Sequence, residues 1–295
     1  MTGTPFDRLR ARSVDRPIIL DGGLATQLEA QGHDLSSALW SARLLTDDPA
    51  AIVAAHQAFF EAGAQMAITA SYQAPLELVG SSVALAGEAR DRHGREGRWI
   101  AGSVGPYGAS LADGSEYHGH YGLSIAELRV WHRPRIDRLA EAGADLLALE
   151  TVPCLAEVEA LLAELAGTGI PAWLSITCVG DRTRAGEPAA EAFAMAAHVD
   201  EVVAVGVNCT DPRDVAGLVR AAATASGKPV VAYPNSGESW DPIGRGWVGE
   251  PAFRVDDVQQ WIDDGARLIG GCCRVSPAQI AALAEQVSCA APPRR

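Results

Sequence analysis

The sequence predicts an α/β protein, a single (βα)8 TIM-type barrel, and three observations support this fold. Eight short apolar runs alternate with helical patterns along the 295 residues. The runs are continuous rather than alternating in polarity, as expected for parallel strands that are buried on both faces. Several helices also end in the same short phrase before the next run. Eight βα units in a chain of this length fit one barrel.

The predicted strands all precede a helical pattern or a loop, and they are Pro17–Gly23, Gln65–Ala70, Trp99–Gly105, Asp145–Thr151, Ala172–Cys178, Val202–Cys209, Pro229–Ser236 and Arg267–Cys272. The clearest helical patterns are Pro49–Ala62, Val83–Arg92, Ile125–Ala142, Leu155–Leu165, Asp211–Ala225, Val255–Asp263 and Pro277–Gln286. Ser124 and Ser276 precede two of these helices as capping residues. An Ala-Gly-Ala or Asp-Gly-Ala phrase around Gly63, Gly143 and Gly265 predicts a left-handed helix end that leads directly into a strand.

A doubly wound open sheet is the structural alternative to the barrel. Such a sheet normally carries a glycine-rich phosphate-binding turn after its first strand, and Asp21-Gly-Gly-Leu24 does not match that turn. The predicted domain organisation is therefore an N-terminal extension at 1–16, one barrel at 17–288, and a C-terminal tail at 289–295.

Charge and hydropathy exclude several classes of partner. The chain has 24 Lys and Arg against 37 Asp and Glu, a net charge of −13. This balance argues against nucleic-acid binding, which needs clustered cations, and against docking on anionic membranes. We find no apolar segment long enough for a membrane span and no targeting segment, so we expect a cytoplasmic protein. Six cysteines in such a chain are typical of metal-binding, catalytic or buried thiols rather than a disulfide scaffold.

Three cysteines fall at predicted strand ends, where barrels of this kind place their active sites. Cys209 ends the sixth strand, and Cys272 and Cys273 end the eighth. Three thiolates and one open position suit a catalytic zinc ion. Adjacent residues of a strand point to opposite faces, so both sulfurs reach one metal only if the strand has ended, which Gly270-Gly271 permits. From spacing alone, a metal site and a pair of buried cysteines in a loop both remain open.

The other candidate residues have two interpretations each. Glu150 follows the apolar run Leu146–Leu149 and needs either a cationic ligand, such as an amino-acid ammonium group, or an Arg from a neighbouring loop. Asp21 either orients a ligand or holds the turn after it. Cys178 lies on the same rim, but we expect it to be buried and inert, and His118 and His120 suit a solvated loop better than a metal site.

The chain resembles the homocysteine S-methyltransferases, in particular the branch that uses S-methylmethionine or S-adenosylmethionine. The matching segments span nearly the whole chain in one order, and they are Asp21-Gly-Gly23, Ala67-Ile-Thr-Ala-Ser-Tyr-Gln73, Ala101-Gly-Ser-Val-Gly-Pro-Tyr-Gly108, Leu111-Ala-Asp-Gly-Ser-Glu-Tyr117, His132-Arg-Pro-Arg135, Ala142-Gly-Ala-Asp-Leu-Leu-Ala148, Tyr233-Pro-Asn-Ser-Gly-Glu238 and Leu268-Ile-Gly-Gly-Cys-Cys-Arg274. The Gly-Gly-Cys-Cys run, combined with the upstream Asn208-Cys209, is the most specific of them.

The resemblance implies a zinc-dependent methyl transfer from a sulfonium donor to the thiol of L-homocysteine, forming methionine. It implies one Zn²⁺ per chain, held by Cys209, Cys272 and Cys273, and no catalytic residue beyond the metal-activated substrate thiol. Asp21 and Glu150 then correspond to homocysteine-binding acids, and Thr69 and Asn235 fall in motifs that line the substrate pocket. The partners implied are these two small molecules.

Two alternatives and one departure accompany the resemblance. The chain can be a zinc- or thiol-binding protein of the same fold without turnover, or a methyltransferase for another thiol or a selenol. The link 74–82 is shorter than the corresponding segment of the family, so the resemblance fixes neither how the site closes nor which donor it selects. The aromatic residues Tyr72 and Tyr233 lie near the rim, where they can face a cationic donor.

Overall fold

The computed structural model describes residues 16–35, 41–241 and 246–289, and it confirms the predicted barrel. Eight strands form one parallel sheet in the order β1-β12-β9-β8-β5-β4-β3-β2. Their bounds are β1 Ile18–Ile19, β2 Met66–Ile68, β3 Trp99–Val104, β4 Leu146–Val152, β5 Ala172–Ile176, β8 Val202–Asn208, β9 Val230–Tyr233 and β12 Ala266–Ile269. Six of these strands lie within predicted runs, whereas β4 extends one residue beyond its run, to Val152, and β12 begins one residue before its run, at Ala266.

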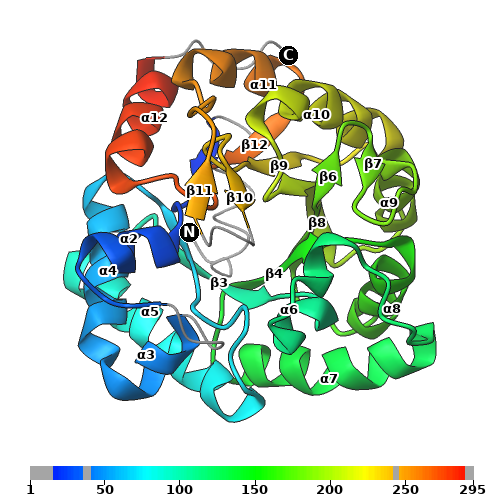
Figure 1. The fold of residues 1–295 in the computed structure, drawn as a ribbon, viewed down its shortest axis with the longest axis horizontal. Helices are drawn as coiled ribbons and strands as arrows, with labels where there is room; N and C mark the ends of the chain where they lie inside the picture. Colours follow the sequence, from blue (N-terminus) through cyan, green and yellow to red (C-terminus); the bar gives the residue numbers. More distant parts are fainter. Residues whose placement is uncertain (1–15, 36–40, 242–245, 290–295) are drawn as a thin grey trace.

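The sheet closes between its first and last strands in this order. Leu20 pairs with Met66 in a parallel bridge, and the Asp21 N–H donates to the Met66 carbonyl over 3.0 Å. The Gln65 N–H donates to the Ile19 carbonyl over 2.7 Å. These contacts join β1 to β2 and complete the ring that Figure 1 shows in the centre of the molecule.

Helices surround the strands on the outside (Figure 1). The outer helices are α4 Pro49–Glu61, α5 Val79–His93, α7 Ile125–Glu141, α8 Leu155–Leu165, α9 Ala189–Ala196, α10 Pro212–Ser226, α11 Val258–Asp263 and α12 Pro277–Cys289. The three predicted glycine helix ends have positive φ angles, at Gly63, Gly143 and Gly265. Ser124 forms a capping box with Glu127 at the start of α7, as its sequence position predicts.

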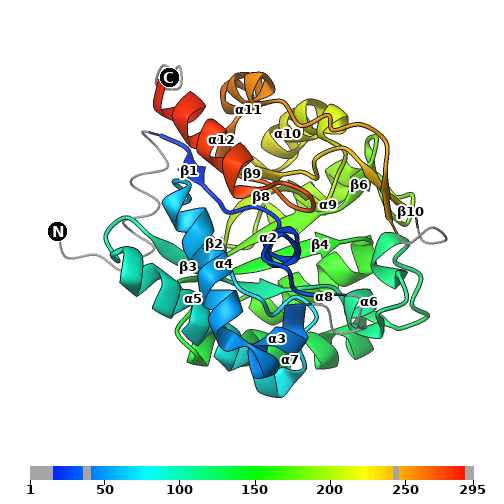
Figure 2. The same cartoon turned by 60° about the vertical axis from the view of Figure 1, so that its left-hand side comes forward.

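Further short elements lie at the carboxyl ends of the strands. They are α2 Leu24–Ala30, α3 Ser41–Asp47, α6 Tyr107–Leu111, the 3₁₀ turns η1 Leu76–Leu78, η2 Ser115–Tyr117 and η3 Val255–Asp257, and the hairpins β6 Cys178–Val179 with β7 Arg182–Thr183 and β10 Ser239–Asp241 with β11 Gly246–Val248. Figure 2 shows β6, β10 and α6 on one side of the molecule, beyond the strands. Loops that carry a site therefore gather at this end.

The core has two layers, which explains why the strand runs are apolar throughout. One layer fills the barrel, with Trp173, Met66 and Leu268 among its members. The other lies between the strands and the helices, with Phe59, Phe193 and Trp261 among its members. A strand that packs on both faces has no solvent-facing positions, so its residues are mainly apolar, and the polar exceptions Ser103 and Ser175 form hydrogen bonds inside the protein.

The structure differs from the sequence prediction at several boundaries. Helix α5 begins at Val79, four residues before the predicted start, and α12 continues to Cys289, the first residue of the predicted tail. His132 is buried inside α7, as is Arg135 of the same matching segment. Almost all of the predicted N-terminal extension and residues 290–295 of the tail lie outside the described residues. No helix among the described residues is long and apolar enough to cross a membrane.

His56 of α4 is fully buried, and neither of its ring nitrogens has a hydrogen-bond partner. Burial lowers the pKa of His56 to about 4. The unfolded chain binds a proton near the ordinary pKa of about 6.5, whereas the folded chain does so only near 4. The contribution of His56 to stability is therefore complete above pH 6.5 and is lost as the pH falls toward 4.

We predict that lowering the pH from 7 to 5 removes about 2 kcal/mol of unfolding free energy through His56 alone. Urea unfolding at the two pH values measures the unfolding free energy. Between pH 7 and pH 5, His56→Leu should lose about 2 kcal/mol less of this free energy than the wild type loses. His198→Gln, which changes an exposed histidine, should keep the wild-type slope. Equal slopes for the wild type and His56→Leu would contradict the prediction.

Candidate metal and substrate site

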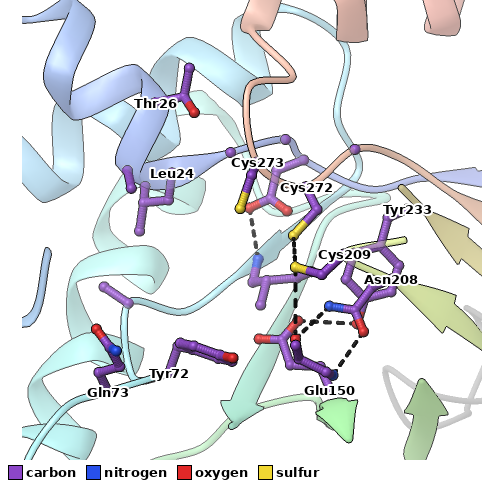
Figure 3. A pocket seen from close by; sticks show the side chains of 18 of the residues that line it. Leu24, Thr26, Tyr72, Gln73, Glu150, Asn208, Cys209, Tyr233, Cys272 and Cys273 are labelled. Atoms are coloured by element: carbon purple, nitrogen blue, oxygen red, sulfur yellow. Dashed lines mark hydrogen bonds between the residues drawn. The ribbon is translucent and has the colours of Figure 1, made fainter. Parts of the chain in front are cut away.

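The three predicted cysteines meet at the carboxyl end of the barrel. Cys209 follows β8, and Cys272 and Cys273 follow β12. Their sulfur atoms all lie within 4.8 Å of one another, and no other group of metal-ligating side chains was found among the described residues. Figure 3 shows the three side chains converging on one space. The side chains thus offer three thiol ligands to one ion.

The predicted break in the last strand is confirmed. Strand β12 ends at Ile269, and the chain then bends over the end of the barrel. A Cβ atom on Gly271 would lie 2.2 Å from the Val275 side chain, so only glycine allows this bend. The Cys272 N–H donates to the Pro234 carbonyl over 2.7 Å. Outside the strand, the two adjacent cysteines are free to face the same point.

Asn235 binds the backbone of Cys273 and does not line the cavity. Its side-chain oxygen accepts a hydrogen bond from the Cys273 N–H over 3.1 Å. Asn235 is absent from the residues that line the cavity described below. The structure therefore places it as a support for the cysteine loop.

Asn208 fixes the position of the third cysteine. Its side chain accepts from the Thr151 N–H and donates to the Thr151 hydroxyl, both over 2.7 Å. The two residues come from β8 and the end of β4, which are not neighbours in the sheet. Thr151 and Cys209 both have positive φ angles, 60° and 48°. This double hydrogen bond ties two irregular strand ends together beside the sulfurs.

The thiol cluster needs positive charge. Hydrogen bonds from Cys209 and Cys272 hold the pKa of Cys273 well below its usual range. The pKa of Cys209 is raised well above its usual range by its hydrogen bonds to Cys272 and Cys273, with burial adding to the effect. One thiolate thus forms easily, and further ones are opposed by the first. A cation shared by the three sulfurs removes this opposition.

A tetrahedral metal fits this donor set after a small adjustment. The sulfurs of Cys209 and Cys272 lie 2.7 Å apart. Tetrahedral ligands at about 2.3 Å from zinc stand about 3.8 Å from one another, so this pair would open by about 1 Å on binding. No rearrangement of the strands is needed, because the side chains alone can turn.

Glu150 lies in the same cavity and has no salt bridge among the described residues. Its two oxygens accept hydrogen bonds from the Ser103 hydroxyl and, over 3.1 Å, from the Tyr233 hydroxyl. Burial raises the pKa of Glu150 to about 7, and Cys272 contributes. Of the two alternatives for Glu150, no Arg partner is present among the described residues. The hydroxyl of Tyr233 is engaged by Glu150, while Tyr233 also lines the cavity.

Asp21 is buried at the end of β1, with one carboxylate oxygen bound and the other without a partner. Oδ2 accepts from the Ile68 N–H over 2.8 Å, whereas Oδ1 has no hydrogen bond. Burial raises the pKa of Asp21 well above its usual range, and Glu150 and Cys272 add to the effect. A ligand that carries positive charge would stabilise the ionised form of both carboxyl groups.

Thr69 lines the cavity, but its hydroxyl is already engaged. It lies 2.8 Å from the Ser71 hydroxyl and accepts from the Ser103 N–H over 2.9 Å.

Cys178 is buried outside the sulfur cluster, as predicted. His118 and His120 are exposed, which agrees with a solvated loop.

The cavity around these residues has a volume of about 490 Å³ and an acidic lining. Among the described residues, its lining contains five carboxylate residues and no Lys or Arg, and the five are Asp21, Glu29, Asp34, Glu116 and Glu150. Tyr72 points into the same space as the sulfurs and Glu150 (Figure 3). Such a lining favours ligands with positive charge.

One wall of the cavity comes from the connection between β3 and α7, which includes Glu116 and Tyr117. Glu157 of α8 anchors this connection at both ends. Its oxygens accept from the Tyr107 N–H over 2.6 Å and from the Tyr121 hydroxyl over 3.0 Å. The ring of His132 lies 2.9 Å from the same carboxylate. In the sequence, these segments are recognisable only by their match to the family, and they do not predict a wall of the cavity.

Comparisons with known proteins show which family the chain resembles along its length. A family model described as homocysteine S-methyltransferase matches residues 18–287. A homocysteine S-methyltransferase of Bacillus subtilis is 42% identical and covers 90% of this chain and 93% of its own. A selenocysteine Se-methyltransferase of Brassica oleracea is 40% identical and covers 90% and 87%. The metallated Escherichia coli homocysteine methyltransferase structure has a TM-score of 0.84 at 39% identity and covers 94% and 98%.

The anchor of this wall gives a stability prediction. Glu157→Ala should lower the unfolding free energy by about 2 to 3 kcal/mol, because it leaves buried donors of α7 and the β3–α7 connection without an acceptor. Denaturant unfolding measures the effect. Glu159→Ala, which removes an exposed carboxylate from the same helix, should change the stability by less than about 0.5 kcal/mol. Similar losses in the two variants would exclude an anchoring role.

Proposed function

The chain belongs to the homocysteine S-methyltransferase family, and from that premise we propose a zinc-dependent methyl transfer from a sulfonium donor to the thiol of L-homocysteine. The chain is a methyltransferase; the metal, the donor and the residue roles are the proposal. One observation carries it: three cysteine sulfurs lie within 4.8 Å of one another in a cavity that also holds Asp21 and Glu150. We assign residues 17–288 to one homocysteine-binding barrel.

Cys209, Cys272 and Cys273 would hold the zinc ion. When bound, the metal supplies positive charge that favours the thiolate form of the acceptor sulfur near neutral pH. Asn208, Thr151 and the turn after β12 keep the three sulfurs in place before any ligand binds. Because the three cysteines are already held close together, little conformational entropy is lost when they bind the metal.

The carboxylates of Asp21 and Glu150 would bind the ammonium group of homocysteine. Both are buried, and Asp21 retains an oxygen without a partner. The hydroxyls of Ser103 and Tyr233 orient Glu150 without neutralising it, so its charge remains available to a cation. Thr69 and Asn235 would act indirectly, Thr69 through Ser103 and Asn235 through the Cys273 backbone.

The chemical step is a displacement at the donor methyl group. The acceptor sulfur forms a bond to the methyl carbon, and the bond from that carbon to the donor sulfur breaks. Its electron pair returns to the donor sulfur, which leaves as a neutral thioether, and the proton of the acceptor thiol is released. Because the leaving group is neutral, the protein contributes mainly by positioning the two sulfurs and by excluding water.

A selenol acceptor is a second candidate. The relative from Brassica oleracea is named a selenocysteine Se-methyltransferase, and it is 40% identical to this chain. The same three sulfurs and carboxylates suit a selenol that carries an amino-acid group. Comparing kcat/KM for homocysteine and selenocysteine with one donor decides between the two acceptors.

We predict that purified protein loaded with zinc converts homocysteine to methionine when it is offered S-methylmethionine or S-adenosylmethionine, with betaine as a parallel third donor. Cys273→Ser should lose bound zinc and lower kcat/KM by about 100-fold or more, because the ion loses one of three ligands. Elemental analysis and a methionine assay measure both effects.

Cys178→Ser is the matched control, since Cys178 is a buried cysteine near the same rim that lies outside the cluster. It should keep both the metal and the activity. Full activity of metal-free wild type, or unchanged zinc content in Cys273→Ser, would exclude the proposed metal role.

We also predict that Glu150→Gln raises the KM for homocysteine by about 10- to 100-fold, because a hydrogen bond from the substrate ammonium to a charged group is lost. The side chain keeps its size, so zinc content and the KM for the methyl donor should stay close to wild type. Steady-state kinetics with each substrate varied in turn measures the split. An unchanged homocysteine KM would remove Glu150 from the binding role.

A further inference from the structure

A second buried carboxylate faces the cavity without a partner, and the roles assigned above do not use it. Glu116 is 7% exposed, and its Oε2 atom has no hydrogen bond. It forms no salt bridge with any described residue, yet it lines the cavity together with the cysteines. A buried, unpaired carboxylate is costly unless a ligand supplies the missing donor.

The electrostatic interactions of Glu116 differ from those of Asp21 and Glu150. The pKa values of Asp21 and Glu150 are raised mainly by burial, and the charge of Cys272 raises both of them further. Glu116 instead neighbours Tyr72, whose pKa is raised well above its usual range by burial and, to a smaller extent, by Cys209 and Glu116. Tyr72 thus lies close enough to both Glu116 and Cys209 to interact electrostatically with each of them.

Tyr117 lines the same cavity. Burial of its hydroxyl raises its pKa well above its usual range, although 40% of the residue is exposed, and Cys273, Cys209 and Glu116 add to the effect. The guanidinium of Arg184 lies 5.6 Å from the centre of the Tyr117 ring, outside the cavity lining. Both tyrosines therefore interact with the carboxylate of Glu116 as well as with sulfurs of the thiol cluster.

Hydrogen bonds fix the backbone around Glu116. The carboxylate of Asp113 accepts from the Ser115 N–H over 2.9 Å and starts the 3₁₀ turn that carries Glu116. Glu157 holds both ends of the connection, as described above. A mobile loop would let Glu116 turn toward water, whereas this anchored turn keeps the carboxylate inside.

We propose that Glu116 binds the α-ammonium group of the methyl donor, with the sulfonium centre of the donor lying along Tyr72 and Tyr117 toward the cysteines. The inference rests on the proposed function, because it assumes that the acceptor's ammonium group is taken by Asp21 and Glu150. A reaction between two amino acids brings two ammonium groups into one cavity. The cavity lining offers two buried carboxylate oxygens without a partner, one on Asp21 and one on Glu116, so that each ammonium group can be bound by a different residue.

This assignment selects one chemical class of donor. S-methylmethionine and S-adenosylmethionine both carry a sulfonium and an α-ammonium group on the same chain, whereas betaine has no α-ammonium group beside its methylated cation. A donor without the ammonium group would leave Glu116 buried and unpaired, and a binding site rejects a ligand that leaves its polar groups unsatisfied. Glu116 is therefore a specificity-determining residue.

The test compares S-methylmethionine with (3-carboxypropyl)dimethylsulfonium, which is the same molecule without its amino group. We measure the dissociation constant of each by calorimetry with zinc-loaded protein, and kcat/KM with homocysteine as acceptor. The wild type should prefer S-methylmethionine by about 10- to 100-fold. Glu116→Gln should lose most of this preference, should raise the KM of S-methylmethionine by a similar factor, and should leave the KM of homocysteine unchanged.

Glu29→Gln is the matched control, since it removes the same charge from an exposed position of the same cavity lining. It should affect both donors equally and keep the preference. Thermal unfolding of Glu116→Gln verifies that the variant is folded; if it is not, Glu116→Asp replaces it and should reduce the preference. A preference in folded Glu116→Gln within about twofold of wild type would overturn the inference, as would an effect confined to homocysteine.

The failure of the inference can be told apart from the failure of the proposed function. If the wild type forms no methionine from any donor, the proposed function fails, while the two dissociation constants still test Glu116. If the wild type forms methionine but binds both donors equally, the function stands and the role of Glu116 is excluded. Absence of measurable binding of either donor to the wild type also overturns the inference.

Discussion

Successive residues of an extended strand point to opposite faces, and this constraint governs the whole site. Cys272 and Cys273 are adjacent, so they can face one point only beyond the end of β12. The bend at Gly271 supplies that end, and it requires glycine because Val275 leaves no room for a side chain there. The N–H groups of Cys272 and Cys273 then donate hydrogen bonds to the Pro234 carbonyl and the Asn235 side chain, which follow the neighbouring strand β9. The position of the sulfurs is thus fixed by the register of the last strands.

Charge is the second constraint, and it follows from the first. Bringing three thiols together in a buried place beside Asp21 and Glu150 concentrates acidic groups where water cannot solvate them. The described lining of the cavity contains no Lys or Arg to offset this concentration. The positive charge must come from what binds, and the proposed metal ion, ammonium groups and sulfonium would each supply it.

Much of this arrangement could be predicted from the sequence, because it depends on where strands end. Cys209 and Glu150 stand directly after continuous apolar runs, and a parallel barrel brings such ends to one rim. Asn235 has the same sequence signature, yet its side chain turns to the Cys273 backbone, since the direction of a residue after a strand depends on contacts distant in sequence. Glu116 was not predicted, because it lies in a connection whose path is set by Glu157, about 40 residues later.

The link after β2 and the β3–α7 connection contribute differently to the cavity. Arg135 of α7 donates hydrogen bonds to the carbonyls of Ser71 and Ala74, the latter over 2.9 Å, so the short link is held against the helix instead of extending over the site. This attachment keeps Tyr72 directed into the cavity, but it leaves the link no length to cover a ligand. In the proposed arrangement, the contacts to the methyl donor beyond Tyr72 would then come from the neighbouring β3–α7 connection. Because the short link leaves the choice of donor open, the proposal assigns that choice to Glu116 and Tyr117 of this connection.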